Sequence, residues 1–328
     1  MSLPGKFMPH LARYLQNDFR TNCPQGWTCQ TEVKVVPPDL ERWLGYAPQA
    51  DAMFQEVATG RRVWVELEIS RADPVANHAK FATAHLLHPL PVADTFVSMV
   101  SRHIARGRSN LCAHTVGLMR AIGLRAFQTP LFPGLGAEEI KRLNHLRGPL
   151  LGEEAPEVMP EMQRLMSVAT VLGHAFDSDI HFAANAVEVV HNVHRWNKDL
   201  SETPQRVLWG KRTVRYFVHD PRTHEFAPSK FAAYLRLPRL AGEDDAGGRS
   251  LTGMNIASYV QIDQEHPLFD GRRAWKHLTK NLGMDAQPLE EQAPTVIDSF
   301  RRWTELHKET VKLNPQGITI LTVPQWAY

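Results

Sequence analysis

The stretch that decides the fold is residues 51–70, DAMFQEVATGRRVWVELEIS. Two runs rich in β-forming residues, 51–57 and 63–70, flank a turn that contains a glycine, and this pattern predicts a β-hairpin. In the second run two sets of residues alternate. One set is apolar, and the other contains Glu66 and Glu68: Val63, Val65, Leu67 and Ile69 against Trp64, Glu66, Glu68 and Ser70. Side chains two positions apart on a strand share a face, so Glu66 and Glu68 are expected on the same side of a sheet.

The segments around this hairpin predict an α/β domain. We expect a helix, three strands, a helix, a strand, a helix and a strand, supported in that order by residues 9–20, 27–36, 51–57, 63–70, 74–88, 94–101, 109–122 and 124–132. Asp73 is the expected cap of the second helix, because Pro74 suits its first position. The order is typical of a mixed sheet with helices on its faces.

The paired glutamates indicate a cation site. Two carboxylates on one face of a strand repel each other and lose hydration if they are buried, and a divalent cation relieves both penalties. Asp51 begins the partner strand, so its carboxylate is expected close to Glu66. Mg²⁺ is the expected cofactor, since it binds one or two carboxylates together with water and phosphate oxygens. The alternative is that Glu66 and Glu68 lie on a solvated face of an edge hairpin.

The element order and the acidic hairpin together resemble the core of the PD-(D/E)XK nuclease superfamily, to which many restriction endonucleases belong. In that family an Asp opens the second core strand, and an acidic residue, any residue and a Lys follow on the third. Here Asp51 is followed, after residues 52–65, by Glu66-Leu67-Glu68. The resemblance covers residues 9–132. It implies metal-assisted hydrolysis of phosphodiester bonds, with Asp51 and Glu66 as metal ligands.

The chain departs from the family pattern at two positions: Ala50 stands before Asp51 where the family has Pro, and Glu68 stands where the family has Lys, which matters more. We expect Glu68 to orient or deprotonate the attacking water. Two further residues are auxiliary candidates. Lys80, on the following helix, replaces the missing cation if its side chain reaches the site, and otherwise it is a solvated lysine. Glu32, on the first strand, is an extra metal ligand unless it pairs with Lys34 or faces solvent.

The second half of the chain carries a local excess of positive charge. The net charge of the whole chain is only +2. Within residues 205–240, however, eight basic residues face only Asp220 and Glu225. Aromatic residues are interleaved with these cations. Cations bind phosphates and guanine, and aromatic rings can stack on exposed bases, so both kinds of residue suit a DNA-binding surface. The DNA-binding candidates are Lys211, Arg212, Arg215, Arg222 and Lys230. The alternative is an ordinary core of aromatics under a solvated surface.

A group of histidines and acids offers a competing function. Residues expected on helices at spacings that allow metal binding are His174, Asp177, Asp179, His181, Glu188, His191 and His194. Such a set is compatible with a helical phosphohydrolase. The pattern lacks a His-Asp dipeptide on these helices, so we favour histidines that serve the surface or core of a helical bundle.

These patterns predict three regions: a nuclease core over 1–134, a helical connector over 135–204 and a C-terminal α+β recognition domain over 205–328. The connector is expected to include a long helical stretch from Met159 to about Trp196. In the last region we expect strands at 206–210, 213–220, 257–262 and 317–324, with helices at about 271–281 and 293–312. Three cysteines are too few for a disulfide framework. No signal peptide or membrane span is visible, so the expected location is the cytoplasm.

The expected function is a Mg²⁺-dependent, sequence-specific endonuclease of restriction type that acts on double-stranded DNA. The expected partners are DNA and a second copy of the chain in a homodimer, with no membrane. Two alternatives remain open. One is a modification-dependent endonuclease that recognises a methylated base, and the other is a non-catalytic DNA-binding protein on a degenerate nuclease scaffold, which the presence of Glu68 allows.

Overall fold

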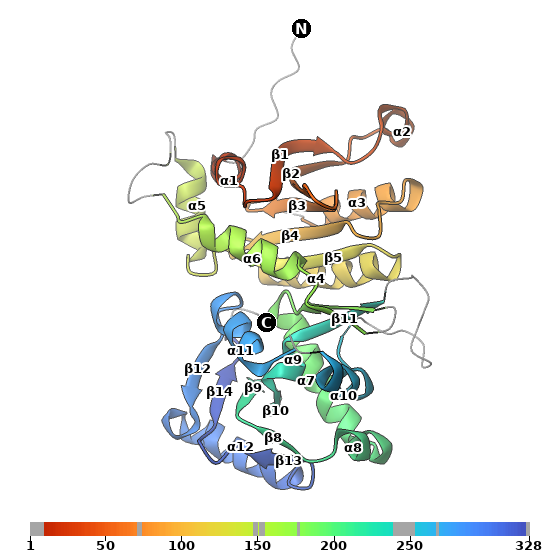
Figure 1. Cartoon of the computed structure of the whole chain (residues 1–328). Helices are drawn as coiled ribbons and strands as arrows, with labels where there is room; N and C mark the ends of the chain where they lie inside the picture. The colour runs from red at the N-terminus through yellow and green to blue at the C-terminus, as the bar shows by residue number, and fades with distance from the viewer. Residues whose placement is uncertain are drawn as a thin grey trace. The chain divides into compact units, whose positions relative to one another are not determined.

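The hairpin predicted from residues 51–70 forms in the computed structural model as strands β2 (Gln49–Glu56) and β3 (Arg62–Glu68) (Figure 1). The structure describes residues 10–70, 74–146, 150, 155–175, 178–238, 253–266 and 269–325. The expected cap Asp73 therefore lies outside the described residues. The chain divides into two units, residues 1–169 and 170–328.

The first unit is built on a five-stranded mixed sheet of order β1-β2-β3-β4-β5. Its further elements are α1 (His10–Thr21), β1 (Trp27–Lys34), α2 (Pro38–Leu44), α3 (Val75–Leu87), β4 (Thr95–Ser101), α4 (Arg106–Ala121), β5 (Arg125–Leu131), α5 (Ala137–His145) and α6 (Met159–Ala169). Strands β1, β2 and β3 pair antiparallel, whereas β3, β4 and β5 pair parallel. Parallel neighbours need a crossover, and α3 and α4 supply it. The predicted order of elements is confirmed, with the short helix α2 added between β1 and β2.

Helices cover both faces of this sheet (Figure 1). Helices α3 and α4 pack side by side, and their apolar residues form one core with the strand residues Trp64 and Phe96. On the other face α1 packs against β1 and β2, where Phe19 meets Phe54 edge-on at 5.6 Å, and α6 packs against β4 and β5. Because both faces are covered, any polar side chain on the central strand β3 is buried and must find a polar partner.

The second unit contains three smaller sheets, of orders β10-β9-β14-β12, β11-β7-β6 and β13-β8. Its strands are β6 (Gly173–Ala175), β7 (Ser178–Phe182), β8 (Arg212–Val214), β9 (Tyr216–Asp220), β10 (Glu225–Pro228), β11 (Tyr234–Pro238), β12 (Asp285–Pro288), β13 (Val311–Leu313) and β14 (Thr319–Thr322). Its helices are α7 (Ala186–Ser201), α8 (Thr203–Trp209), α9 (Ser229–Ala232), α10 (Ile256–Glu265), α11 (Gly271–Lys280), the 3₁₀ turn η2 (Leu289–Glu291) and α12 (Pro294–Leu306). The unit is therefore mixed α and β, as expected for the C-terminal region.

The predicted connector does not form a separate body. Helices α5 and α6 belong to the first unit, whereas β6, β7 and α7 belong to the second. The long helical stretch expected from Met159 is also wrong, since the hairpin of β6 and β7 interrupts it. Apolar residues recur at several spacings in this stretch. Such a pattern is compatible with a buried helix and equally with a buried strand.

Two predicted strands of the second unit are helices. Residues 206–210 fall mostly in α8, which has Pro204 in its first turn and ends on the buried Trp209. Residues 257–262 fall in α10, where the Asn255 side chain accepts a hydrogen bond from the Ser258 amide. The proline and the side-chain cap favour helices at these positions over the β-propensity of Val207 and Val260. Among the described residues, no helix has both the length and the apolarity needed to cross a bilayer.

Candidate active site

Asp51 and Glu66 meet where β2 and β3 separate. The last residue pair that these strands form is Ala52 with Val65, and the same register continued by one residue sets Asp51 opposite Glu66. There the Leu67 amide donates a hydrogen bond to Asp51 Oδ2, at 2.7 Å, instead of to a backbone carbonyl. This bond fixes the carboxylate of Asp51 beside the strand that carries both glutamates.

Glu66 and Glu68 are buried beneath α3. Their exposed fractions are 3% and 0%, so the alternative of a solvated strand face is wrong. The Asn77 side-chain amide donates to Glu66 Oε2 at 3.1 Å and to Glu68 Oε1 at 2.8 Å. Asn77 lies in the first turn of α3, the helix that follows β3 directly. One amide group thus partners two buried carboxylates, which limits their mutual repulsion only in part.

A polar pocket opens between β2, β3 and α3. Gln49, Asp51, Glu66, Asn77 and Lys80 line it, together with two apolar residues, Ala47 and Phe81. Lys80 comes from α3 three positions after Asn77, a spacing that puts both side chains on one helix face. The structure therefore brings the auxiliary candidate to the same pocket as two of the predicted catalytic carboxylates. Glu68 is not among the residues that line this pocket.

The ammonium group of Lys80 is available in this pocket. Within the described part of the chain, Lys80 forms no ion pair or hydrogen bond, and its side chain is partly exposed. No other carboxylate in that part of the chain therefore holds the Lys80 ammonium group away from the pocket. A cation in this position is able to neutralise charge on an anionic group that enters the pocket.

Glu32 takes part in holding Asp51. The β1–β2 ladder omits Glu32 and Asp51, and Glu32 adopts a φ of 54°, a conformation unusual for a residue with a side chain. Gln16 of α1 donates to the Glu32 carboxylate at 2.8 Å and to the Asp51 carbonyl at 2.9 Å, and Gln49 donates to the Glu32 carbonyl at 2.7 Å. Glu32 does not line the pocket. Through its hydrogen bonds with Gln16 and Gln49 it helps to hold the backbone on which Asp51 lies.

Three amide side chains of this site were missed by sequence reasoning: Gln16, Gln49 and Asn77. Gln49 precedes Asp51 by two positions and therefore shares its strand face, which is a signal that the sequence does carry. Asn77 and Gln16 carry no such signal, because their roles depend on how α3 and α1 pack on the sheet. All three donate hydrogen bonds to acidic residues or to the backbone beside them.

The donor set of the pocket fits Mg²⁺ better than a metal held by protein ligands alone. Asp51 and Glu66 offer carboxylate oxygens, and Gln49 adds an amide group. No group of three or more His, Cys, Asp or Glu side chains placed for metal binding occurs in the part of the chain that the structure describes. Mg²⁺ usually takes one or two carboxylates and completes its shell with water and phosphate oxygens, so two carboxylates suffice.

The basic segment of the second unit separates into exposed and internally paired cations. Lys211, Arg215 and Arg222 are exposed, although Arg222 also lies 4.0 Å from the Asp220 carboxylate. Arg212 and Lys230 instead form ion pairs with the same Asp263 and are partly buried, with exposed side-chain fractions of 24% and 20%. Arg239, which belongs to the predicted basic cluster, lies outside the described residues.

Most aromatic residues of this segment belong to the core of the unit. Five of them are fully buried: Trp209, Phe217, Phe226, Phe231 and Tyr234. Only Tyr216, among the six aromatic residues interleaved with the cations, is partly exposed, and the Arg215 guanidinium lies 5.4 Å from its ring. These five residues are therefore core residues, as the alternative interpretation of the segment held, and they have no ring face accessible to a DNA base.

The histidines and acids of the second unit form structural contacts. His174 and His181 lie on β6 and β7 and not on helices, and His174 pairs with Asp179 at 2.7 Å. His194 of α7 bonds Asp220 of β9 at 2.9 Å and so ties the helix to the sheet. The Glu188 carboxylate accepts the Ala184 amide at the start of α7. Asp177 lies outside the described residues. These contacts favour structural roles over the phosphohydrolase alternative.

The exposed cations lead to a prediction about how the affinity for DNA depends on salt concentration. Replacing Lys211 and Arg215 together by Ala should reduce the slope of log affinity against log salt by about two, since each lost phosphate contact removes about one unit. Lys230→Ala should change the slope less, because Lys230 is paired with Asp263. The measurement is a salt titration of duplex binding in Ca²⁺, with Lys280→Ala as the control. Equal effects of Lys280→Ala and the double variant would exclude this surface.

Comparison of the chain with protein-family models, with curated proteins and with solved structures finds no match. The pocket between β2, β3 and α3, which joins two carboxylates to an unpaired lysine within the described residues, is thus the ground on which a function can be assigned.

Proposed function

We propose that this chain is a Mg²⁺-dependent endonuclease of restriction type, which hydrolyses phosphodiester bonds in double-stranded DNA. The observation that carries the proposal is the pocket lined by Asp51, Glu66 and Lys80. Two carboxylates and a lysine on a mixed sheet of this strand order are the combination that the resemblance to PD-(D/E)XK nucleases leads one to expect. The lysine here comes from α3 and not from β3.

Asp51 and Glu66 are the residues that would hold the metal. Bound Mg²⁺ would polarise the scissile phosphoryl oxygen and lower the pKa of a water molecule. The protein keeps both carboxylates in position, Asp51 through the Leu67 amide and Glu66 through Asn77. Because Glu66 is almost fully buried, it has little freedom to turn away from the pocket.

Lys80 and Glu68 take different parts in this proposal. The Lys80 ammonium faces the incoming phosphate and stabilises the negative charge that grows in the transition state. Glu68 is fully buried and does not line the pocket, so a positioning role replaces the predicted contact with water. It holds Asn77, which in turn holds Glu66.

A plasmid assay tests the proposal. Supercoiled DNA incubated with the protein and Mg²⁺ should be nicked or linearised, and EDTA should prevent it. Ca²⁺ should support binding without turnover. Binding without cleavage under every metal condition would support the non-catalytic alternative and refute the proposal. Methylated and unmethylated plasmids, compared in the same assay, separate a conventional restriction activity from a modification-dependent one.

Glu68 substitutions distinguish positioning from direct catalysis. Glu68→Gln keeps an acceptor for Asn77, so cleavage should fall less than about tenfold and its pH dependence should not change. Glu68→Ala removes the acceptor and should raise the Mg²⁺ concentration for half-maximal cleavage by about 10- to 100-fold, as loss of an indirect metal partner does elsewhere. A Glu68→Gln loss of about 10²-fold with an altered pH profile would instead indicate contact with the attacking water.

A further inference from the structure

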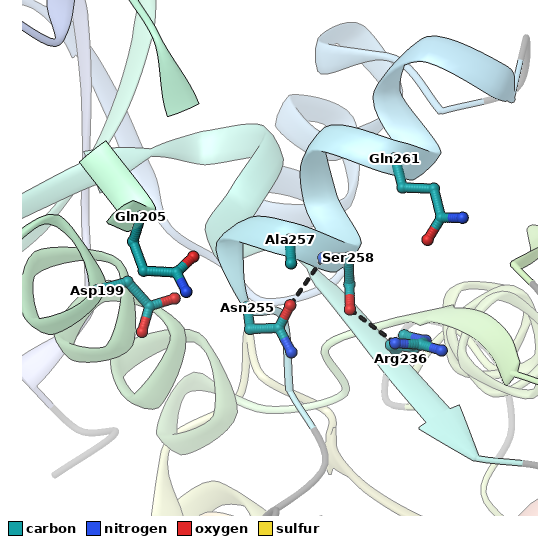
Figure 2. A pocket seen from close by; sticks show the side chains of 7 residues that line it. All are labelled: Asp199, Gln205, Arg236, Asn255, Ala257, Ser258 and Gln261. Carbon is teal, nitrogen blue, oxygen red and sulfur yellow. Dashed lines mark hydrogen bonds between the residues drawn. The ribbon is translucent and has the colours of Figure 1, made fainter. Parts of the chain in front are cut away.

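The second unit contains a polar pocket that the proposed cleavage chemistry does not use. Its volume is about 490 Å³, within the range of sites for small molecules. Helices α7, α8 and α10 and strand β11 contribute to it (Figure 2). The residues that line it are Asp199, Gln205, Arg236, Asn255, Ala257, Ser258 and Gln261. Of these seven, only Ala257 is apolar, so the pocket suits a ligand that forms many hydrogen bonds.

Internal hydrogen bonds hold the floor of this pocket in place. Asn255 Oδ1 accepts the Ser258 amide at 2.7 Å, and the Ser258 hydroxyl accepts from Arg236 at 2.8 Å (Figure 2). Asp199 Oδ2 accepts the Ile256 amide at 3.1 Å. These bonds fix three elements relative to one another inside the unit. The pocket is therefore organised before any ligand arrives, which lowers the entropic penalty of binding.

Two glutamine side chains of this pocket have groups that can form hydrogen bonds with a ligand. Gln205 Oε1 is buried and has no hydrogen-bond partner within the described residues. The Gln261 side chain likewise forms no hydrogen bond in that part of the chain. Figure 2 shows the two carboxamides on opposite sides of Asn255 and Ser258. A buried polar atom without a partner is costly, by about 1–3 kcal/mol, so Gln205 Oε1 points to a ligand that supplies a donor. The partly exposed Gln261 carboxamide offers both a donor and an acceptor to the same ligand.

The charges around the pocket limit what that ligand is. Among the lining residues the Asp199 carboxylate and the Arg236 guanidinium balance each other, which favours a neutral polar group inside. Burial raises the pKa of the Asp199 carboxyl, while the Ile256 amide and the nearby cations Arg195 and Lys198 oppose this shift. Among the described residues around Asp199, these two cations outnumber the one further carboxylate, Glu202, and this local excess of positive charge favours a ligand that carries an anionic attachment.

We propose that this pocket receives a single nucleobase turned out of the DNA duplex, with Gln205 and Gln261 hydrogen-bonding to opposite edges of the base. The inference rests on the proposed function and extends it, since it assigns a reading site to the second unit. A base that is stacked and paired inside the duplex cannot enter a pocket, whereas an extruded base exposes the donors and acceptors that carboxamides match. Arg195 and Lys198, the two cations near Asp199, would neutralise the flanking phosphates in this arrangement.

Duplexes with one unpaired nucleotide test this proposal, because a bulged base needs little energy to leave the stack. Affinities for bulged and fully paired duplexes of the same sequence are measured by fluorescence anisotropy, in EDTA, with each of the four bases in the bulge. The whole chain should bind at least one bulged duplex about tenfold more tightly than the paired duplex. Gln205→Ala and Gln261→Ala should each reduce that preference severalfold, and the double variant should abolish it.

Gln316→Ala is the matched control, because Gln316 is an exposed glutamine of the same unit. Thermal melting of each variant separates loss of the fold from loss of the site. Equal affinity for bulged and paired duplexes, or a preference that survives in the double variant, overturns the proposal. So does binding of a neutral oligosaccharide through Gln205 and Gln261 without preference for the bulge. Cleavage of plasmid DNA is measured separately, so failure of the nuclease proposal is distinguishable from failure of this one.

Discussion

Asp51→Asn and Glu66→Gln should each abolish DNA cleavage in Mg²⁺ while duplex binding in Ca²⁺ stays within about twofold. Both substitutions keep the side-chain oxygen that accepts a hydrogen bond, from the Leu67 amide and from Asn77 respectively, so the fold is preserved. Each removes a negative charge that would hold the metal. Metal assistance contributes several kcal/mol to such reactions, so the loss should reach about 10³-fold or more.

The controls for this result are Asp39→Asn and Glu139→Gln, which change exposed carboxylates of the same unit. They should cleave at the rate of the unmodified chain. Metal binding gives a second measurement that does not depend on turnover: Mn²⁺ affinity, followed by electron paramagnetic resonance, should fall in the two pocket variants and not in the controls. Full cleavage by either pocket variant would show that the active site lies elsewhere.

Lys80→Met should reduce the cleavage rate by about 10²- to 10³-fold, the usual effect of removing one group that stabilises transition-state charge. Met and Lys have similar helix propensities, so α3 should remain intact. Lys80→Arg keeps the positive charge and should retain part of the activity. The expected change is in kcat, because Lys80 is proposed to act on charge that develops only during the reaction.

Lys141→Met on α5 is the matched control, since Lys141 is a surface lysine of the same unit. It should leave the rate unchanged. A Lys80→Met variant that cleaves normally would contradict the assignment and return the cationic role to a residue outside this pocket. Together with the Glu68 variants, this experiment decides which residue replaces the lysine that the family motif has on the third strand.

Local signals determined much of the first unit. Alternation along residues 63–70, the glycine of the turn and the helical spacing that follows set the order of its elements and the shared face of Glu66 and Glu68. These signals act between near neighbours in the chain, so they are readable without the fold. Asp51 opposite Glu66 also follows from hairpin register, because a short turn fixes which residues pair.

Packing between distant segments decided the rest. Burial of Glu66 and Glu68, the bridge from Asn77 and the arrival of Lys80 all depend on how α3 lies on β3, and the sequence does not state the angle or depth of that packing. In the second unit, caps and tertiary burial overrode β-propensity in α8 and α10. The sequence alone therefore determined which acidic residues share a strand face. Only the tertiary structure decided that they are buried and that a lysine from the next helix lies beside them, because those contacts join side chains whose spacing no local pattern encodes.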